Sequence, residues 1–242
     1  MAFLLIDTHV HSKPISCCSW LHSADIPRIF KAVNFDGFML SNHFNKEYLC
    51  QFGDTYLEQV NSYIACHDEA VAAAKEIGIK VFFGTEAKVR DSYIDENGET
   101  KYFYPEFLVF GLTKEKLLRS PVIYNITQKE LFEFANSENM LIFQTHPYRV
   151  FQGYKPANPS FMHGIEVLNG HPHFDPMVEE TLKFATENNL LMSAGSDMHI
   201  EKQAGKAGII VPDFIETSED LAEFLKQNKP KNIDKEKFIL EF

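Results

Sequence analysis

Histidine and acidic residues recur in this sequence just after short apolar segments, at five places along 242 residues. They are His9 with His11, His43, Glu86, His146, and Asp197 with His199. Imidazole and carboxylate groups are common protein ligands of zinc, manganese and iron. One histidine after a strand is unremarkable, but five such placements indicate side chains that gather at one rim of a fold. The chemistry expected of such a rim is metal-assisted hydrolysis.

Two of these motifs carry paired ligands. In DTHVH (residues 7–11), an extended backbone points both imidazoles to the same side, where they can reach one ion. Asp7 in this motif is placed to act as an outer-sphere partner of the ion. In GSDMH (residues 195–199), a carboxylate replaces one imidazole at the same spacing. Glu86 follows a segment rich in Val and Phe, and its carboxylate can bridge two cations.

Seven short apolar or β-rich segments are predicted to be strands. They are Phe3–Ile6, Gly37–Leu40, Lys80–Phe83, Phe107–Phe110, Leu141–Phe143, Gly164–Leu168 and Leu190–Ser193. Continuous apolar segments of this length are typical of parallel strands covered on both faces. The alternation with helical patterns predicts an α/β fold with right-handed crossovers.

Helical patterns lie between most of these strands. They cover Asp54–Ile77, Thr127–Glu138, Asp175–Asn188 and Ser218–Asn228. Asp54 is expected to cap the first helix, and Thr127 with Glu130 forms the capping-box pattern of the second. Pro176 is expected at the first position of the third helix.

Seven strand–helix units fit a closed or nearly closed barrel, and the rival arrangement is an open doubly wound sheet. Closure is favoured because ligands from the first, second, third, fifth and seventh strands would be spread along a line in an open sheet. No linker or low-complexity stretch divides residues 1–242, so a single domain is expected. Residues 229–242 are expected to form a C-terminal extension that packs on the barrel.

Amino-acid composition restricts the binding partners and the cellular compartment expected for the chain. The formal charge of −11 argues against long nucleic acids, because phosphate contacts need surplus Lys and Arg, but allows a small anionic substrate. Cys17, Cys18, Cys50 and Cys66 have neither CxxC spacing nor disulfide density, which favours a reduced, cytoplasmic setting. No signal peptide is recognisable, and no segment approaches the roughly 18 to 20 apolar residues of a membrane span.

Taken in order, the motifs resemble those of the polymerase-and-histidinol-phosphatase (PHP) superfamily of metal-dependent phosphoesterases. These motifs are DTHVH, SNH, GTE, THP and GSDMH, and they extend from His9 to His199. The resemblance implies a distorted (β/α)7 barrel similar to a TIM barrel, which agrees with the seven predicted strands. It also implies two or three divalent ions (zinc, manganese or iron) that activate water for attack on a phosphate ester.

Carried over by position, the resemblance implies a ligand set for each ion. The first ion would be held by His9, His11, Glu86 and Asp197, the second by Glu86 and His146, and the third by His43 and His199. Asp197, His199 and His146 are the residues expected to be closest to the reaction.

Two departures from the family pattern concern these ligands. Relatives usually have Asp or His five or six residues after the second histidine of HxH, where this chain has Ser16 and Cys17. Cys17 can bind zinc as a thiolate, or can be a structural cysteine. Many relatives end the fourth strand with a His-x-x-Gly pattern, whereas Leu108 here cannot ligate. His171 and His173 are candidates to supply that missing ligand or to contact substrate.

Cationic side chains on the same rim are candidate phosphate ligands. Arg149 can grip phosphate in bidentate fashion, with Tyr148 beside it, whereas Lys13 and Lys88 would act as point charges. The alternative is that they are solvated loop charges. Glu166 and Asn169 are expected to face the pocket or support its ligands.

Three functions remain open at this point. The first is hydrolysis of a small phosphomonoester, related to that of histidinol phosphatases. The second is a phosphodiesterase or nuclease acting on nucleotides or short single strands. The third is a metal-stabilised, non-catalytic regulatory domain. The leaving group is expected to be selected by the loops Asp91–Tyr104 and Gly153–His163.

Overall fold

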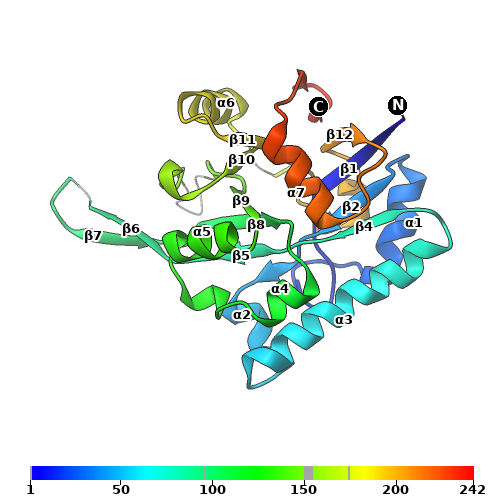
Figure 1. Cartoon of the computed structure of the whole chain (residues 1–242), viewed down its shortest axis with the longest axis horizontal. Coiled ribbons are helices and arrows are strands. Elements are labelled where there is room, and N and C mark those ends of the chain that lie inside the picture. The colour runs from blue at the N-terminus through cyan, green and yellow to red at the C-terminus, as the bar shows by residue number, and fades with distance from the viewer. Residues whose placement is uncertain (1, 95, 150–154, 174) are drawn as a thin grey trace.

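The structure is a computed structural model that describes residues 2–94, 96–149, 155–173 and 175–242 (Figure 1). Its first sheet has six strands in the order β13-β14-β12-β1-β2-β4. These strands are β1 (Phe3–Val10), β2 (Gly37–Leu40), β4 (Lys80–Phe83), β12 (Gly208–Pro212), β13 (Asn232–Asp234) and β14 (Ile239–Glu241). The expected C-terminal extension therefore contributes β13 and β14 to this sheet, and β14 pairs with β12.

The second sheet also has six strands, in the order β11-β10-β9-β8-β5-β3. These strands are β3 (His43–Phe44), β5 (Glu86–Lys88), β8 (Glu106–Phe110), β9 (Leu141–Gln144), β10 (Gly164–Asn169) and β11 (Leu191–Gly195). A separate hairpin of β6 (Asp91–Ile94) and β7 (Thr100–Phe103) projects as an arm from the rest of the molecule (Figure 1).

Short bends carry the chain from one sheet to the other. Residues 41–42 join β2 to β3, and residues 84–85 join β4 to β5. A parallel bridge between Val10 and Met198 links β1 to the segment after β11. Within the described residues the strand pairing forms two six-stranded sheets and a separate hairpin, and not one closed ring, so barrel closure stays a prediction.

Each of the seven predicted strands overlaps an observed one, but parallel pairing throughout is wrong. β8 runs antiparallel to both β5 and β9, and β12 runs antiparallel to β1. The chain passes from β5 to β8 through the β6–β7 hairpin, without a crossover helix, and returns in the opposite direction. No α-helix separates β11 from β12 either, and parallel neighbours need such a crossover.

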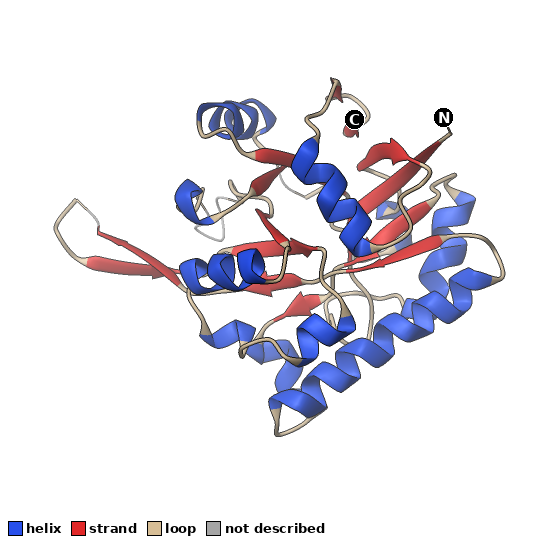
Figure 2. Ribbon diagram, in the orientation of Figure 1, coloured by secondary structure: helices blue, strands red, loops and turns tan. Residues whose placement is uncertain are grey.

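Helices lie outside the strands (Figure 2). The four predicted helices correspond to α3 (Tyr56–Lys75), α5 (Gln128–Ser137), α6 (Val178–Glu187) and α7 (Ser218–Gln227). Three shorter α-helices were not predicted: α1 (Ile26–Ala32), α2 (Lys46–Leu49) and α4 (Lys114–Leu118). Short 3-10 turns cover Ser23–Asp25, Cys50–Phe52, Ile123–Asn125, Pro159–Phe161 and Glu201–Gln203.

The helix caps confirm one expectation and correct two. Thr127 and Glu130 form the predicted capping box of α5. Thr55, and not Asp54, caps α3, because its hydroxyl accepts the backbone N–H of Glu58 in a second capping box. α6 begins only at Val178, so Pro176 precedes the helix instead of opening it.

Apolar side chains between the sheets and helices form the core, which is rich in phenylalanine. Phe82, Phe107, Phe110 and Phe143 are almost completely buried there. This packing holds the strand ends in place and so fixes the positions of the loops that follow them. None of the helices in the described part of the chain has the length and hydrophobicity needed to cross a bilayer.

We predict that His67 makes the fold sensitive to acid. Its imidazole is buried on α3, with its ring centroid 4.7 Å from that of Phe83, and burial lowers its pKa from 6.5 to about 4. The folded state therefore favours the neutral ring, and its stability should fall as pH drops from about 6.5 to about 4. The loss attributable to His67 should be up to about 3 kcal/mol, since one pKa unit corresponds to about 1.4 kcal/mol.

Urea unfolding across this pH range checks the prediction. His67→Leu should lose less stability on acidification than the wild type does, whereas the exposed His22→Leu should keep the wild-type slope. Equal slopes for His67→Leu and the wild type would contradict it.

Candidate metal centre

The structure brings together the side chains that the sequence analysis singled out as ligands. These are His9, His11, His43, Glu86, His146, Asp197 and His199, and all of them belong to groups whose nitrogen or oxygen atoms are close enough to share an ion. They come from the end of β1, the start of β3, the start of β5 and the segments after β9 and β11. The expected convergence of distant motifs is therefore present.

The carboxylate of Glu86 lies at the centre of this group. Its Oε1 is 3.3 Å from His9 Nε2 and 3.0 Å from His146 Nε2. Its Oε2 is 2.6 Å from His43 Nδ1 and 3.6 Å from His11 Nε2. Burial alone would raise the pKa of Glu86, but the positive charge of His9 and His43 holds it well below its usual value. Glu86 is therefore an ionised carboxylate in contact with four imidazoles.

Asp197 approaches the same imidazoles from the segment after β11. Its Oδ1 lies 3.3 Å from His11 Nε2 and 3.6 Å from His9 Nε2, and its Oδ2 pairs with the guanidinium of Arg149. Burial opposes ionisation, but the charges of Arg149 and then His9 hold the pKa of Asp197 well below its usual value. The residue adopts a φ of 54°, and His146 a φ of 27°. Left-handed backbone is uncommon at non-glycine residues, although Asp and His adopt it more readily than most.

Hydrogen bonds orient His9 and His11 so that one nitrogen of each faces the centre. His9 Nδ1 contacts Glu166 Oε1 at 2.9 Å, and His11 Nδ1 contacts Ser16 Oγ at 3.3 Å. The Ser16 hydroxyl donates to Asn42 Oδ1, so its oxygen accepts from His11 Nδ1. Both imidazoles therefore carry a proton on Nδ1 and direct Nε2 toward the centre, where a bound cation would take the place of any proton on that nitrogen. Ser16 thus supports a ligand.

Two buried acidic residues accept hydrogen bonds from the backbone around the site. Asp7 Oδ1 accepts the backbone N–H groups of His9 and Ser196, and so ties β1 to the segment after β11. Burial raises the pKa of Asp7 to about 7. Glu166 Oε2 accepts the backbone N–H of His146 and the side-chain amide of Asn169, as expected for pocket-facing residues.

Gly195 lets the segment after β11 approach β1. A Cβ on Gly195 would lie 2.4 Å from the Cβ of His9, closer than carbon atoms can approach. Glycine at this position of the GSDMH motif is therefore a packing requirement, because it brings Asp197 next to the histidines of β1.

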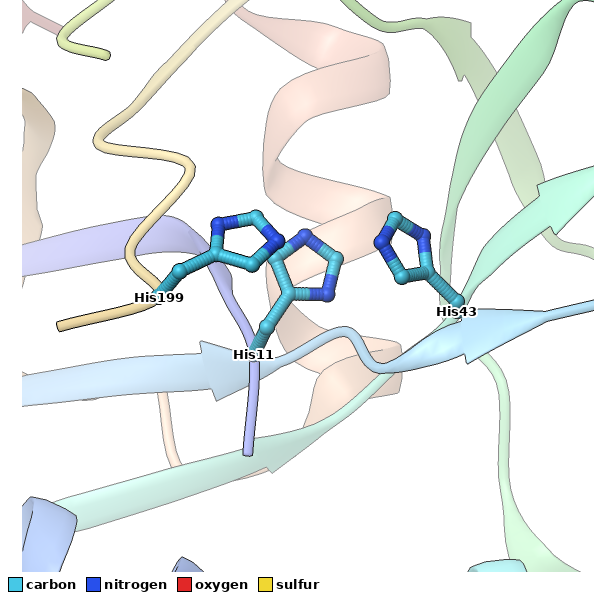
Figure 3. Close-up of side chains that lie close together, drawn as sticks. All are labelled: His11, His43 and His199. Atoms are coloured by element: carbon cyan, nitrogen blue, oxygen red, sulfur yellow. The ribbon is translucent and has the colours of Figure 1, made fainter. Parts of the chain in front are cut away.

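His11, His43 and His199 form a cluster of three imidazoles, and they point toward one another in Figure 3. The ring centroid of His11 is 4.3 Å from that of His43 and 4.4 Å from that of His199. Burial, and then the positive charge of His43 and His199, holds the pKa of His11 well below 6.5. His11 is therefore neutral, with a lone pair available to a cation.

Donor atoms that the protein leaves without hydrogen bonds are free to bind divalent cations. Five buried atoms that face one another make no regular hydrogen bond, although His43 Nδ1 and Glu86 Oε2 lie 2.6 Å apart: His9 Nε2, His11 Nε2, His43 Nδ1, Glu86 Oε2 and Asp197 Oδ1. Unsatisfied buried polar atoms are costly and rare in proteins. Cations between them would satisfy all five, so these residues fit the divalent metal ions that the family resemblance implies.

Glu106 is a member of this site that the sequence analysis missed. Its side chain is buried at the start of β8, its Oε2 lies 3.8 Å from His146 Nε2, and it can share an ion with His43 and Glu86. Leu108 pairs with Glu86 across the β5–β8 ladder, so Glu106 lies on the same face as the missing ligand position. A parallel β8 would place Glu106 at the opposite end of the sheet, which is why the prediction overlooked it.

A cavity of about 460 Å³ opens onto the centre. It is lined by Cys18, Trp20, His43, Asn45, Glu47, Tyr48, Lys88, Glu106, Arg149, His171, His173, His199, Ile200 and Gln203. Two of the predicted phosphate ligands, Arg149 and Lys88, are therefore at the cavity wall. Lys13 is not, and Tyr148 lines a smaller neighbouring cavity with His146 and Arg149.

The remaining candidate ligands are His171, His173 and Cys17. His171 and His173 line the cavity, and the ring centroid of His171 lies 6.0 Å from that of His199. Within the described part of the chain, the groups able to share an ion include neither of them, nor Cys17 or Cys18. Cys18, which was not predicted, is the cysteine that lines the cavity. Residues 153 and 154 of one expected substrate loop lie outside the described residues.

We predict that Glu166 controls metal affinity through His9, which it orients. Glu166→Ala should weaken binding of zinc or manganese by about 10- to 100-fold, as loss of a ligand's hydrogen-bond partner does in metal sites. Isothermal titration calorimetry measures this change. Glu180→Ala, an exposed change on α6, serves as the control and should bind as the wild type does. Unchanged affinity in Glu166→Ala would show that His9 does not depend on this hydrogen bond.

Comparisons with known proteins identify one matching segment and a shared fold. A family model described as PHP-associated matches residues 179–230, which include Asp197 and His199. No curated protein matches the chain. A two-domain protein from Bacteroides vulgatus, containing a predicted PHP-like metal-dependent phosphoesterase, matches 84% of this chain at 22% identity with a TM-score of 0.55. The chain spans only 54% of that protein.

Two further solved structures share the fold at lower identity. PsfC from Pseudomonas syringae has a TM-score of 0.61 at 15% identity, over 92% of this chain and 88% of its own. The lesion-specific endonuclease PfuEndoQ from Pyrococcus furiosus has a TM-score of 0.52 at 14% identity, over 93% of this chain and 56% of its own. Likeness at these identities shows a common fold.

Proposed function

We propose that this chain belongs to the PHP superfamily and is a metal-dependent hydrolase of small phosphate monoesters. The observation that carries the proposal is the contact of four imidazoles with the two oxygens of one buried carboxylate, Glu86, beside a cavity of about 460 Å³. Such a donor set suits divalent cations.

Two or three ions (zinc, manganese or iron) are proposed, each with its own ligands. The first would be held by His9, His11, Glu86 and Asp197, the second by Glu86, His146 and Glu106, and the third by His43 and His199. Glu86 suits a bridging role because its two oxygens face different imidazoles. Glu106 would supply the oxygen ligand that Leu108 cannot.

Divalent cations at these positions would polarise a phosphoryl oxygen and supply a water nucleophile near neutral pH. The chain itself would orient the ester. Arg149 and Lys88 bring positive charge to the cavity wall, and a guanidinium suits the oxygens of a phosphate dianion. Asp197 connects the proposed metal ligands to the proposed phosphate ligand, because it contacts both the imidazoles and Arg149. Asp197, His146 and His199 are the side chains proposed to lie closest to the phosphate.

Cavity size and charge favour a small substrate. A volume of about 460 Å³ is typical of pockets for small molecules. The net charge of −11 disfavours a long nucleic acid, whereas the local cations favour a single phosphate group. The shared fold with an endonuclease makes phosphodiester hydrolysis the second candidate. A non-catalytic regulatory role is disfavoured because seven potential ligands are all retained in one cluster.

We predict that activity requires metal and prefers monoesters. Chelation should abolish turnover of para-nitrophenyl phosphate, and zinc or manganese should restore it. His9→Ala should remove activity even with added metal, whereas His22→Ala, an exposed histidine, should retain it. Full turnover by metal-free protein would refute the mechanism. Faster turnover of bis-para-nitrophenyl phosphate than of the monoester would establish the second candidate instead.

We predict that Glu106 holds one ion. Glu106→Ala should lower the bound metal by about one ion per chain, measured by elemental analysis, because a carboxylate is a strong ligand for such ions. Glu47→Ala is the matched control, since Glu47 lines the same cavity but is exposed and pairs with Lys88. Undiminished metal content in Glu106→Ala would remove Glu106 from the ligand set.

A further inference from the structure

Trp20 lies beside the metal centre, on the loop that follows β1. Its backbone N–H donates to the carbonyl oxygen of His199 at 2.9 Å, and the Ser19 hydroxyl donates to the same oxygen at 3.1 Å. On the other side, the backbone N–H of Lys13 donates to the carbonyl oxygen of Leu21 at 2.7 Å. The backbone around Trp20 is therefore held in place next to His199, one of the proposed metal ligands.

The cavity that opens onto the centre is buried at one end and exposed at the other. Glu106 and Arg149 line its buried end, where they are 8% and 9% exposed and contact proposed metal ligands. Trp20 lines the same cavity, yet it is 76% exposed. A phosphate held by Arg149 and the metal ions would occupy the buried end, so its ester group would extend toward the exposed end.

Aromatic rings supply most of the apolar lining of this cavity. Two large aromatic side chains line it, Trp20 and Tyr48, together with four imidazoles. Ile200 is the one branched aliphatic side chain among the lining residues that the structure describes. Aromatic rings attract one another in offset-stacked or edge-to-face arrangements, and this attraction adds to the effect of the area that they bury. A fixed, exposed indole in such a cavity is therefore suited to hold a flat ring.

We propose that Trp20 selects the leaving group of the substrate by stacking against a planar aromatic ring, an inference that rests on the phosphate monoester hydrolysis proposed above. The metal ions, Arg149 and Lys88 would recognise the phosphate, which all such esters share. Trp20 would instead contact the part that differs between esters. A flat ring can lie face to face with the indole, whereas a saturated ring of the same size cannot. The site is therefore selective for aryl phosphates over alkyl phosphates.

The fluorescence of the zinc-loaded full chain tests this placement, because Trp20 is its only tryptophan. Phenylphosphonate is the probe, since its carbon–phosphorus bond resists hydrolysis. Its binding should shift or quench the tryptophan emission, because the phenyl ring would displace water from the exposed indole. Inorganic phosphate is the control: it would fill only the buried end of the cavity and should leave the emission close to that of the free protein. Saturation with phenylphosphonate without a change in emission would contradict the placement.

Isothermal titration calorimetry measures the selectivity. Cyclohexylphosphonate is the matched ligand, because it has the same number of ring carbons as phenylphosphonate but is not planar. The zinc-loaded wild type should bind phenylphosphonate at least about threefold more tightly than cyclohexylphosphonate. Trp20→Ala should bind the two with nearly equal affinity, and Trp20→Phe should restore most of the preference. Leu57→Ala, an exposed apolar change on α3 outside the cavity, is the control and should keep the wild-type preference.

Binding selectivity and turnover can fail independently of each other. The role of Trp20 is overturned if phenylphosphonate does not bind, if the wild type shows no preference for it, or if the preference survives in Trp20→Ala. Because Trp20 is exposed, its replacement should leave the fold and the metal content unchanged, which circular dichroism and elemental analysis check. A preference that is lost in Trp20→Ala, in a chain that hydrolyses no phosphate ester, would support the stacking site while refuting hydrolysis. Turnover of para-nitrophenyl phosphate without the preference would do the reverse.

Discussion

The buried carboxylate of Glu86 is the interaction on which the rest of this site depends. An ionised carboxylate away from water is strongly destabilising unless opposite charge or donors surround it. Here four imidazoles from three other segments surround it, and they in turn need their inward lone pairs satisfied. Cations among these side chains would meet this mutual requirement, because they would satisfy polar atoms that the protein's own hydrogen bonds leave unsatisfied.

Hydrogen bonds from residues outside the ligand set hold the ligand side chains in position. Asn42 links the segment after β2 to β1, because its side-chain oxygen accepts from the backbone of Ser12 and from the hydroxyl of Ser16. Glu166 links β10 to β1 and to the segment after β9, because it contacts the side chain of His9 and the backbone N–H of His146. The ligands are therefore positioned by residues on other strands, and not by their own loops alone. Preorganisation of this kind is what metal sites require.

The reversed direction of β8 explains the clearest departure from the expected ligand set. In the antiparallel ladder, the start of β8 lies beside the end of β9, so Glu106 reaches the imidazole of His146. Leu108 remains in the core opposite Glu86. The hairpin of β6 and β7 produces this reversal, because it returns the chain without a crossover helix. The peripheral β6–β7 hairpin therefore determines that Glu106, and not Leu108, lies beside His146.

The sequence by itself determined seven of the strand segments, four of the helices and the seven principal ligand candidates. These depend on local periodicity and spacing: His9 and His11 share a face because an extended backbone alternates its side chains. Only the tertiary structure decided that β8 is antiparallel, that Glu106 lies beside the histidines, and that Cys18 instead of Cys17 lines the cavity. Strand direction and the path of a loop depend on contacts between residues far apart in sequence, and local patterns carry no information about those contacts.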